Sequence, residues 1–178
     1  MRVIAGEFRS RRLKTLPGLE LRPTPDRLRE ALFNILAPRI VGAVFVDAYA
    51  GAGAVGIEAL SRGAARAFFI ERSRPASAVI HANLSSLGLE KRVEVFTGKV
   101  QTVLPRLTAD IIFADPPYLL DAEYGVLLRV LSAHPPPLAL IQHHRKRTLP
   151  PSAGPIERYR VLSQGENCVS FYRRAGEA

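Results

Sequence analysis

Val44-Phe45-Val46-Asp47-Ala48-Tyr49-Ala50-Gly51-Ala52-Gly53-Ala54-Val55-Gly56 is the stretch of this chain that decides its fold. Its first five residues are mostly apolar and β-branched or aromatic, as in a buried strand. Three glycines follow, and from Ala54 to Arg62 the apolar residues recur at helical spacing. A strand, a glycine-rich turn and a helix in this order predict the first part of a βαβ unit, whose strands run parallel.

Short apolar runs and helical patterns keep alternating beyond this stretch, which implies a parallel sheet covered by helices on both faces. Two later runs, Glu157–Ser163 and Asn167–Arg173, flank Gln164-Gly165-Glu166 with no helix between them, so they predict an antiparallel hairpin. The expected class is α/β, with a mostly parallel seven-stranded sheet that ends in this C-terminal hairpin. The other strands are expected at Val44–Ala48, Ala67–Glu71, Val93–Phe96, Asp110–Asp115 and Leu138–His143, and the helices near Ala54–Arg62, Pro75–Leu87, Val100–Arg106 and Glu123–Ala133.

A small basic element precedes the sheet. Residues 2–8 and 12–16 alternate loosely around a turn near Ser10, which predicts a β-hairpin with a basic face, and Pro17-Gly18 ends it. We therefore expect residues 1–20 to form a hairpin extension and residues 21–178 to form the α/β domain.

A helix is expected after the extension. Thr24 is the predicted N-cap and Pro25 the predicted first helical residue, because proline has no N–H to leave unpaired there. Pro38 is expected just past the end of this helix.

Length and composition narrow the class of protein. A chain of 178 residues is long enough for one domain, and no apolar stretch is long enough to span a membrane. The first residues contain no long apolar region, so no signal peptide is expected. The single cysteine, Cys168, excludes an internal disulfide framework and is typical of a reducing cytoplasm. No Cys/His cluster has zinc spacing, so no metal is expected. We expect a cytoplasmic monomer.

The charge of the chain indicates a polyanionic partner. The formal net charge is +9, and residues 1–29 hold eight arginine or lysine residues against three acidic ones. Most of the basic residues are arginines, whose planar guanidinium can bind phosphate with two hydrogen bonds. The alternative is a soluble basic protein whose charged face is merely solvated, and the concentration of charge near the N-terminus argues against it.

The glycine loop predicts a nucleotide-like cofactor. Gly51, Gly53 and Gly56 spell G-x-G-x-x-G, and Glu71 follows Gly51 by 20 residues at the end of the next strand. An acidic residue there binds ribose hydroxyls in both NAD and S-adenosylmethionine sites. Asp47 favours S-adenosylmethionine, because a carboxylate repels a diphosphate and attracts a sulfonium and an ammonium. The alternative is that the glycines only allow close strand–helix packing.

Asp115-Pro116-Pro117-Tyr118 predicts the second part of the site, because it follows the apolar run 110–114 at the carboxyl end of a strand. The Asp115 carboxylate and the Pro116 carbonyl can accept hydrogen bonds from an amine, and the prolines stiffen the turn. The Tyr118 ring offers a face on which a flat base can stack. The four residues suit a planar heterocycle with an exocyclic amine, as nucleic-acid bases have.

These motifs resemble the class I, Rossmann-like S-adenosylmethionine-dependent methyltransferases, and in particular the RsmD family of bacterial enzymes that methylate a guanine N2 in small-subunit ribosomal RNA. The resemblance covers nearly the whole chain, and the stretch from Arg22 to Asn34 is what points to this family. It implies S-adenosyl-L-methionine as cofactor and 16S rRNA, within an assembled or assembling small subunit, as partner. The matching segments are residues 2–6, 9–13, 21–34, 47–56, 58–64 and 115–118.

The candidate site residues follow from the motifs and the resemblance together. Asp115, Pro116, Pro117 and Tyr118 are the candidate catalytic residues. The candidate cofactor-binding residues are Asp47, Tyr49, Gly51, Gly53, Glu71 and Lys99, with Tyr49 equally compatible with a place in the core. The candidate RNA-binding residues are Arg2, Arg9, Arg11, Arg12 and Arg22.

The chain departs from the family at three places. Ser10 stands where the family usually has glycine, and a hairpin bend tolerates serine. Gly98-Lys99-Val100 lacks the acidic or amide residue that meets the adenine amine in many relatives, so the Lys99 backbone N–H is the expected substitute. Residues 142–147 are basic where an acidic residue is expected, which widens the predicted RNA surface.

Other functions remain open from the sequence. A DNA adenine or cytosine N-methyltransferase would share the Asp-Pro-Pro-Tyr motif, although 178 residues leave little room for a separate target-recognition domain. A non-catalytic RNA-binding module of the same fold is a different class of answer. An NAD oxidoreductase is the weakest reading, because no acid/base partner for hydride transfer is visible.

Overall fold

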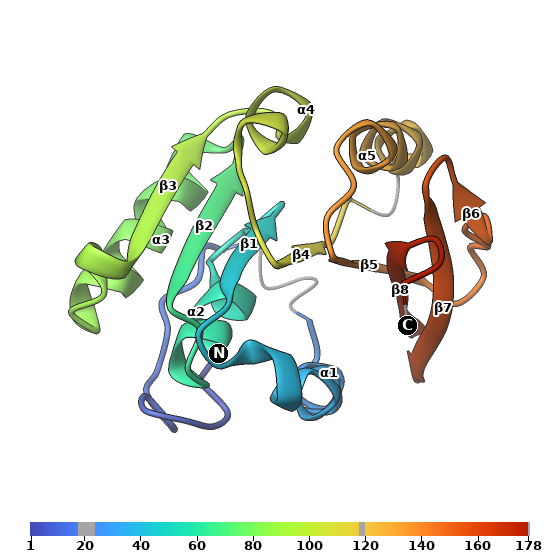
Figure 1. Cartoon of the computed structure of the whole chain (residues 1–178). Coiled ribbons are helices and arrows are strands. Elements are labelled where there is room, and N and C mark those ends of the chain that lie inside the picture. The colour runs from blue at the N-terminus through green and yellow to red at the C-terminus, as the bar shows by residue number, and fades with distance from the viewer. Residues whose placement is uncertain (18–23, 118–119, 178) are drawn as a thin grey trace.

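The computed structural model describes residues 1–17, 24–117 and 120–177, and Figure 1 shows its elements. Within them no helix is long and apolar enough to cross a membrane. The helices are α1 (Asp26–Ile40), α2 (Ala54–Ser61), α3 (Arg74–Ser86), α4 (Val100–Val103) and α5 (Asp121–Ala133), with 3-10 turns η2 (Glu90–Arg92) and η3 (Leu104–Arg106). The strands are β1 (Val44–Ala48), β2 (Arg66–Glu71), β3 (Val93–Thr97), β4 (Ile111–Ala114), β5 (Leu138–His144), β6 (Ser152–Ala153), β7 (Ile156–Gln164) and β8 (Asn167–Arg174).

All these strands join one sheet in the order β3-β2-β1-β4-β5-β8-β7-β6. Strands β1 to β5 pair in parallel, whereas β8, β7 and β6 pair antiparallel. The strand order reverses between β1 and β4, because β2 and β3 extend the sheet on one side of β1 and β4 and β5 extend it on the other. In an open α/β sheet the ligand crevice lies outside the carboxyl ends of the strands at such a reversal.

Helices cover both faces of the sheet, as the strand–helix alternation predicts. In Figure 1, α4 and α5 lie on one side of the sheet, and α1, α2 and α3 on the other. One core cluster joins Leu32 of α1 and Leu60 of α2 to Phe69 on β2. The second cluster joins Leu127 of α5 to Ile112 on β4, on the opposite face. Alternate residues of the central strands therefore enter different cores.

The structure confirms the α/β class and corrects several details of the prediction. The sheet has eight described strands instead of seven, because β6, a two-residue strand, pairs with the start of β7. Helix α1 has Pro25 as its N-cap with no side-chain cap, and it includes Pro38 inside its last turn. The predicted helix 100–106 divides into α4 and η3, where Pro105 lacks the N–H that would continue the α-helical hydrogen bonds.

The N-terminal segment folds back on itself with very little regular pairing. Arg2 and Arg12 form one antiparallel bridge, and two backbone bonds, Val3 N–H to Arg11 O (3.0 Å) and Ser10 N–H to Val3 O (2.9 Å), close the loop. Ser10 has φ +69°, a left-handed backbone conformation that favours glycine. The division of the chain at residue 20 stays a prediction, since residues 18–23 lie outside the described structure.

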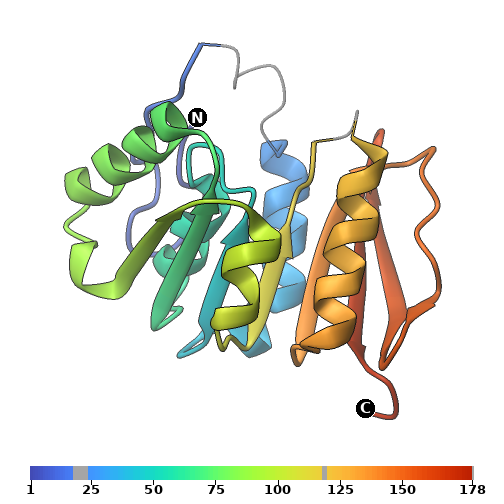
Figure 2. The same cartoon turned by 90° about the horizontal axis from the view of Figure 1, so that it is seen from above.

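Side chains of α2 and α3 fasten this segment to the domain. The carboxylate of Glu58 accepts the N–H groups of Ile4 (2.8 Å) and Ala5 (3.1 Å). Asn83 accepts Lys14 N–H at 2.7 Å and donates to the Ala52 carbonyl at 3.0 Å, so it ties the segment to the glycine loop. Figure 2 shows the N-terminus near the edge of the sheet at which β4 ends.

Candidate active site

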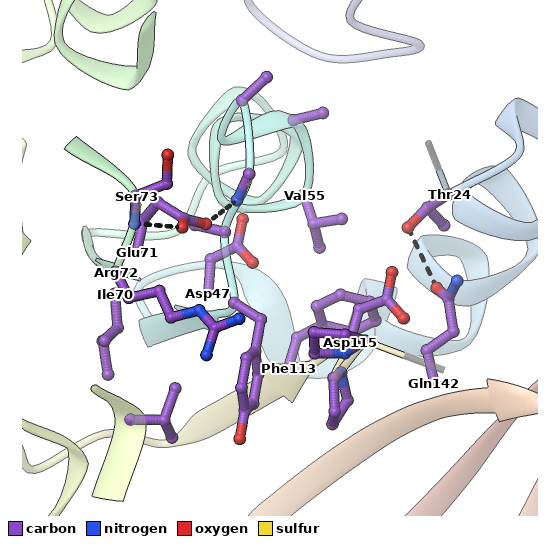
Figure 3. A pocket seen from close by; sticks show the side chains of 18 of the residues that line it. Thr24, Asp47, Val55, Ile70, Glu71, Arg72, Ser73, Phe113, Asp115 and Gln142 are labelled. Carbon is purple, nitrogen blue, oxygen red and sulfur yellow. Dashed lines mark hydrogen bonds between the residues drawn. The ribbon is translucent and has the colours of Figure 1, made fainter. Parts of the chain in front are cut away.

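A large cavity opens at the carboxyl ends of β1, β2, β4 and β5, with a volume of about 860 Å³. This size is in the range of cofactor and substrate pockets. Its wall includes the glycine loop with Glu71, the turn of Asp115 and Pro116, and the pair Thr24 and Gln142. In Figure 3, Glu71 lies on one side, Asp115 nearer the middle, and Thr24 with Gln142 on the other side. The predicted cofactor residues and the predicted catalytic turn therefore share one cavity.

Each glycine of the loop stands at its position for a different structural reason. Gly51 has φ +58°, and a Cβ there would meet no described atom within 4 Å, so its backbone faces open space. Gly53 is the N-cap of α2 at φ +83°. At Gly56 a Cβ would lie 2.4 Å from Phe69, which shows close strand–helix packing. Close packing therefore accounts for Gly56, whereas the open space beside Gly51 can hold a ligand.

Glu71 is held in place by the two loops that flank it. One carboxylate oxygen accepts the Gly51 N–H at 2.8 Å, and the other accepts the Ser73 N–H at 2.8 Å. A carboxylate has about four acceptor positions. After two bonds to the backbone, each oxygen can still accept one hydroxyl hydrogen, which matches the two ribose hydroxyls of a nucleoside.

Asp47 is buried, with 2% of its surface exposed, at the end of β1. Its carboxylate accepts the Gly56 N–H at 2.8 Å, so it also fixes the first turn of α2. Burial raises the pKa of the Asp47 carboxyl well above its ordinary value, and the neighbouring charges of Asp115 and Glu71 add to this, against the effect of the Gly56 hydrogen bond. Because the three carboxyl groups of Asp47, Asp115 and Glu71 lie near one another, the site is suited to a cation.

Tyr49 and Lys99 line the cavity at positions set by the backbone. Tyr49 has φ +62°, and its hydroxyl donates to Glu123 on α5 at 3.1 Å. Burial, followed by the charge of Glu123, raises the pKa of the Tyr49 hydroxyl. The ring thus bridges the glycine loop and α5 while facing the cavity. Lys99 is the N-cap of α4, and its binding role stays a prediction.

Asp115 and Pro116 form the corner after β4. Asp115 is partly exposed in the cavity, and its N–H donates to the Ala48 carbonyl at 3.4 Å, which ties the corner to β1. The Pro116 carbonyl accepts the Tyr124 hydroxyl at 3.4 Å and, as a carbonyl, has a second acceptor position. Pro117 is exposed at the rim. Tyr118 lies outside the described residues, so its stacking role stays a prediction.

The wall opposite the glycine loop holds residues for which the sequence predicts no place in the cavity. The Thr24 hydroxyl donates to Oε1 of Gln142 at 3.0 Å, across 118 positions of sequence. His144 on β5 and Glu166 in the β7–β8 turn also line this side, with 3.6 Å between His144 Nε2 and Glu166 Oε2. A polar side chain at the end of a parallel strand was the one available signal for Gln142.

The N-terminal arginines lie outside the cavity. Arg2, Arg9, Arg11 and Arg12 are all exposed. Arg2 pairs loosely with Asp26 (3.7 Å), and Arg11 donates to the Ser86 carbonyl at 2.9 Å. Of the described N-terminal residues, Met1 and Thr15 reach the cavity wall. Arg22 lies outside the described residues, and RNA contact by any of these arginines stays a prediction.

These features together fit S-adenosylmethionine. Glu71 has acceptors for a nucleoside ribose, Gly51 leaves space beside it, and the three carboxyl groups favour a cationic centre over a diphosphate. A sheet of this order, with an Asp-Pro-Pro corner at its fourth strand, defines a class I S-adenosylmethionine-dependent methyltransferase.

The chain belongs to the RsmD family, because the family described as "Conserved hypothetical protein 95" matches residues 1–173. The Haemophilus influenzae protein named ribosomal RNA small subunit methyltransferase D is 34% identical over 156 residues, which cover 84% of this chain and 81% of that protein. The Escherichia coli K12 protein of the same name is 43% identical over 119 residues, 66% of this chain and 60% of that protein. The solved structure of yhhF from Escherichia coli superimposes with a TM-score of 0.86 at 32% identity and covers 99% of each chain.

Proposed function

We propose that this protein transfers a methyl group from S-adenosyl-L-methionine to the exocyclic N2 of a guanine in 16S rRNA. The names of the relatives support small-subunit ribosomal RNA as the substrate. The observation that carries the transfer to a base amine is the Asp115–Pro116 corner, which faces the same cavity as Glu71 and the glycine loop. Guanine N2 follows from the resemblance to the family.

The glycine-loop side of the cavity holds the cofactor in this proposal. Glu71 accepts the ribose hydroxyls, Gly51 lets the backbone come close, and Asp47 lies where a positive charge is favourable. Bound there, S-adenosylmethionine supplies an electrophilic methyl group on a positively charged sulfur. The chain positions this group and excludes water from it.

The Asp115–Pro116 corner prepares the base amine. The nitrogen of an aryl amine is a poor nucleophile, because its lone pair is delocalised into the ring. Two acceptors aimed at its N–H bonds draw the nitrogen towards a tetrahedral shape, so the lone pair points at the methyl group. The Asp115 carboxylate also stabilises the positive charge that develops on the nitrogen, and it can take the proton that leaves afterwards. Proximity supplies the rest of the acceleration.

The substrate is large and charged in this proposal. A base inside a helix must leave its stack to enter the cavity, and the surrounding phosphates need positive partners. The exposed arginines of the N-terminal segment supply them in this proposal. We infer an assembled or assembling small subunit as the natural substrate, and a monomer acting in the cytoplasm.

The test is to incubate the protein and the cofactor with unmodified small subunits, digest the RNA, and identify the methylated nucleoside by mass spectrometry. N2-methylguanosine is expected. Asp115→Ala should fold normally and lose at least about 100-fold in transfer rate, equivalent to roughly 3 kcal/mol. Glu94→Ala, at an exposed carboxylate on the edge strand β3, is the matched control. A methylated adenine or cytosine, or no methylated base at all, would contradict the proposal, and near-normal turnover by Asp115→Ala would remove that residue from the mechanism.

A further inference from the structure

Gln142 is a buried polar side chain on the cavity wall that the methyl-transfer mechanism does not use. Only 2% of its surface is exposed, although it lines the large cavity. Burying an amide is costly unless its polar atoms are bonded, and this one accepts the Thr24 hydroxyl at 3.0 Å through Oε1. An amide carbonyl has two acceptor positions, so Oε1 can accept a second donor.

The sheet places Gln142 beside the catalytic corner. Ala114 at the end of β4 pairs with Ile141 of β5, and the next residues along the two parallel strands are Asp115 and Gln142. The Tyr124 hydroxyl reinforces this arrangement, because the backbone carbonyls of Pro116 (3.4 Å) and Gln142 (3.3 Å) both lie within hydrogen-bond distance of its oxygen. In Figure 3, Asp115 and the Thr24–Gln142 pair border the same part of the cavity.

The chemistry of the three base amines makes this position informative. Next to the N2 amine of guanine lies N1–H, a donor, followed by O6, an acceptor. The ring nitrogen next to the amine of adenine or cytosine is an acceptor and carries no hydrogen. The Asp115–Pro116 corner accepts hydrogen bonds from the amine of any of these bases, so it cannot distinguish guanine from adenine or cytosine. A second acceptor beside the corner can, because only guanine has an N–H at the ring position that it would face.

We propose that Gln142 is the specificity-determining residue for guanine, an inference that rests on the proposed function. When Asp115 and Pro116 hold the N2 amine, Gln142 Oε1 accepts from N1–H and its amide nitrogen donates to O6. Thr24 is a positioning residue, because its hydroxyl holds Oε1 and so fixes which end of the amide is the acceptor.

The experiment compares two bases that share the reacting amine. Once the methylated nucleotide has been mapped, small subunits are reconstituted with either guanosine or 2-aminopurine at that position. 2-Aminopurine keeps the amine and lacks both N1–H and O6. Rates of methyl transfer from tritiated cofactor are measured for the wild type and for Gln142→Met, which keeps the length of the side chain and removes its hydrogen bonds.

The wild type should methylate guanosine roughly 10- to 100-fold faster than 2-aminopurine, as a two-bond amide–base pair discriminates. Gln142→Met should narrow this ratio to within about 3-fold, by slowing guanosine alone. Gln142→Glu, which keeps an acceptor and loses the donor, should fall between them, and Thr24→Val should also narrow the ratio. Gln164→Met, at a glutamine that is not among the described cavity residues, should keep the wild-type ratio.

An equal loss on both bases in Gln142→Met and Gln142→Glu would overturn the inference, because it would show a structural role alone. An unchanged ratio in both variants would overturn it as well. The proposed function fails separately and earlier, if the wild type transfers no methyl group to the guanosine subunits.

Discussion

Replacement of Glu58 by alanine tests whether the N-terminal segment is a fixed part of the enzyme. The Glu58 side chain has 0% of its surface exposed. It accepts Ile4 N–H (2.8 Å), Ala5 N–H (3.1 Å) and Arg62 Nε (2.7 Å), so three donors depend on one carboxylate. Removal of one partner of a buried ion pair costs about 3 to 5 kcal/mol. Because Arg62 is partly exposed and water can reach the two amides once the segment moves, we expect the lower end, about 3 kcal/mol.

Urea unfolding of wild type, Glu58→Ala and Glu58→Gln measures this loss. The glutamine variant keeps an acceptor oxygen of the same shape, so it should lose less than the alanine variant. Hydrogen exchange should show faster exchange at Val3, Ser10 and Leu13, whose amides bond within the segment, while amides of the central strands keep their protection. A loss below about 1 kcal/mol with unchanged exchange would refute the idea that Glu58 anchors the segment.

Three further outcomes follow from the site. Deletion of residues 1–16 should leave cofactor binding intact, weaken RNA binding and make that binding less dependent on salt concentration. Filter binding over a salt series measures this dependence. An unaltered slope of affinity against salt would count against RNA contact by the N-terminal arginines. Glu71→Ala should weaken S-adenosylhomocysteine binding by at least about 10-fold, since hydrogen bonds to a charged group contribute roughly 1.5 to 3 kcal/mol; unchanged affinity in calorimetry would refute the ribose assignment. The pKa of Asp47 is raised in the folded state, so its carboxyl stabilises the fold less and less as pH rises above about 4. Asp47→Asn should therefore be more stable than wild type at neutral pH, lose that advantage below about pH 4, and bind the cofactor more weakly. Thermal unfolding of both proteins across a pH series measures the difference in stability. A variant less stable than wild type at neutral pH would contradict the prediction.

The sequence predicts the elements of this fold well where each strand is buried on both faces. β1 has the predicted bounds, and β5 differs by one residue, because continuous apolar runs end where the chain leaves the core. The bounds of α1 were harder to predict. Threonine is a common N-cap residue, but the Thr24 hydroxyl donates to Gln142 instead of capping α1. Gln142 is distant in the sequence, so the residues around Thr24 do not indicate this partner. β6 is too short to leave a pattern in the sequence.

The candidate site divides in the same way. The shared location of Asp47, Glu71 and Asp115 was predictable, because each stands at or just past the carboxyl end of a recognisable strand and parallel strands bring these ends together. The sequence predicts for Gln142 only a place at the start of a basic stretch, although this side chain is buried on the wall of the cavity. Glu58 carried no signal, since a glutamate in a helix is usually solvated and its donors belong to a distant part of the chain.

The glycine loop shows how one motif can serve cofactors of opposite charge. Gly51, Gly53 and Gly56 have the spacing of a dinucleotide site, and Gly56 gives the close strand–helix packing of such sites. Asp47 changes what the loop can bind. Its carboxylate accepts the Gly56 N–H, one of the first amides of α2, so that donor is not offered to a phosphate. Burial, and then the charges of Asp115 and Glu71, raise the pKa of Asp47. A diphosphate would meet an occupied amide and three acidic groups, whereas a cation relieves their mutual repulsion. We therefore propose that Asp47, the acidic residue before the glycines, selects the class of cofactor.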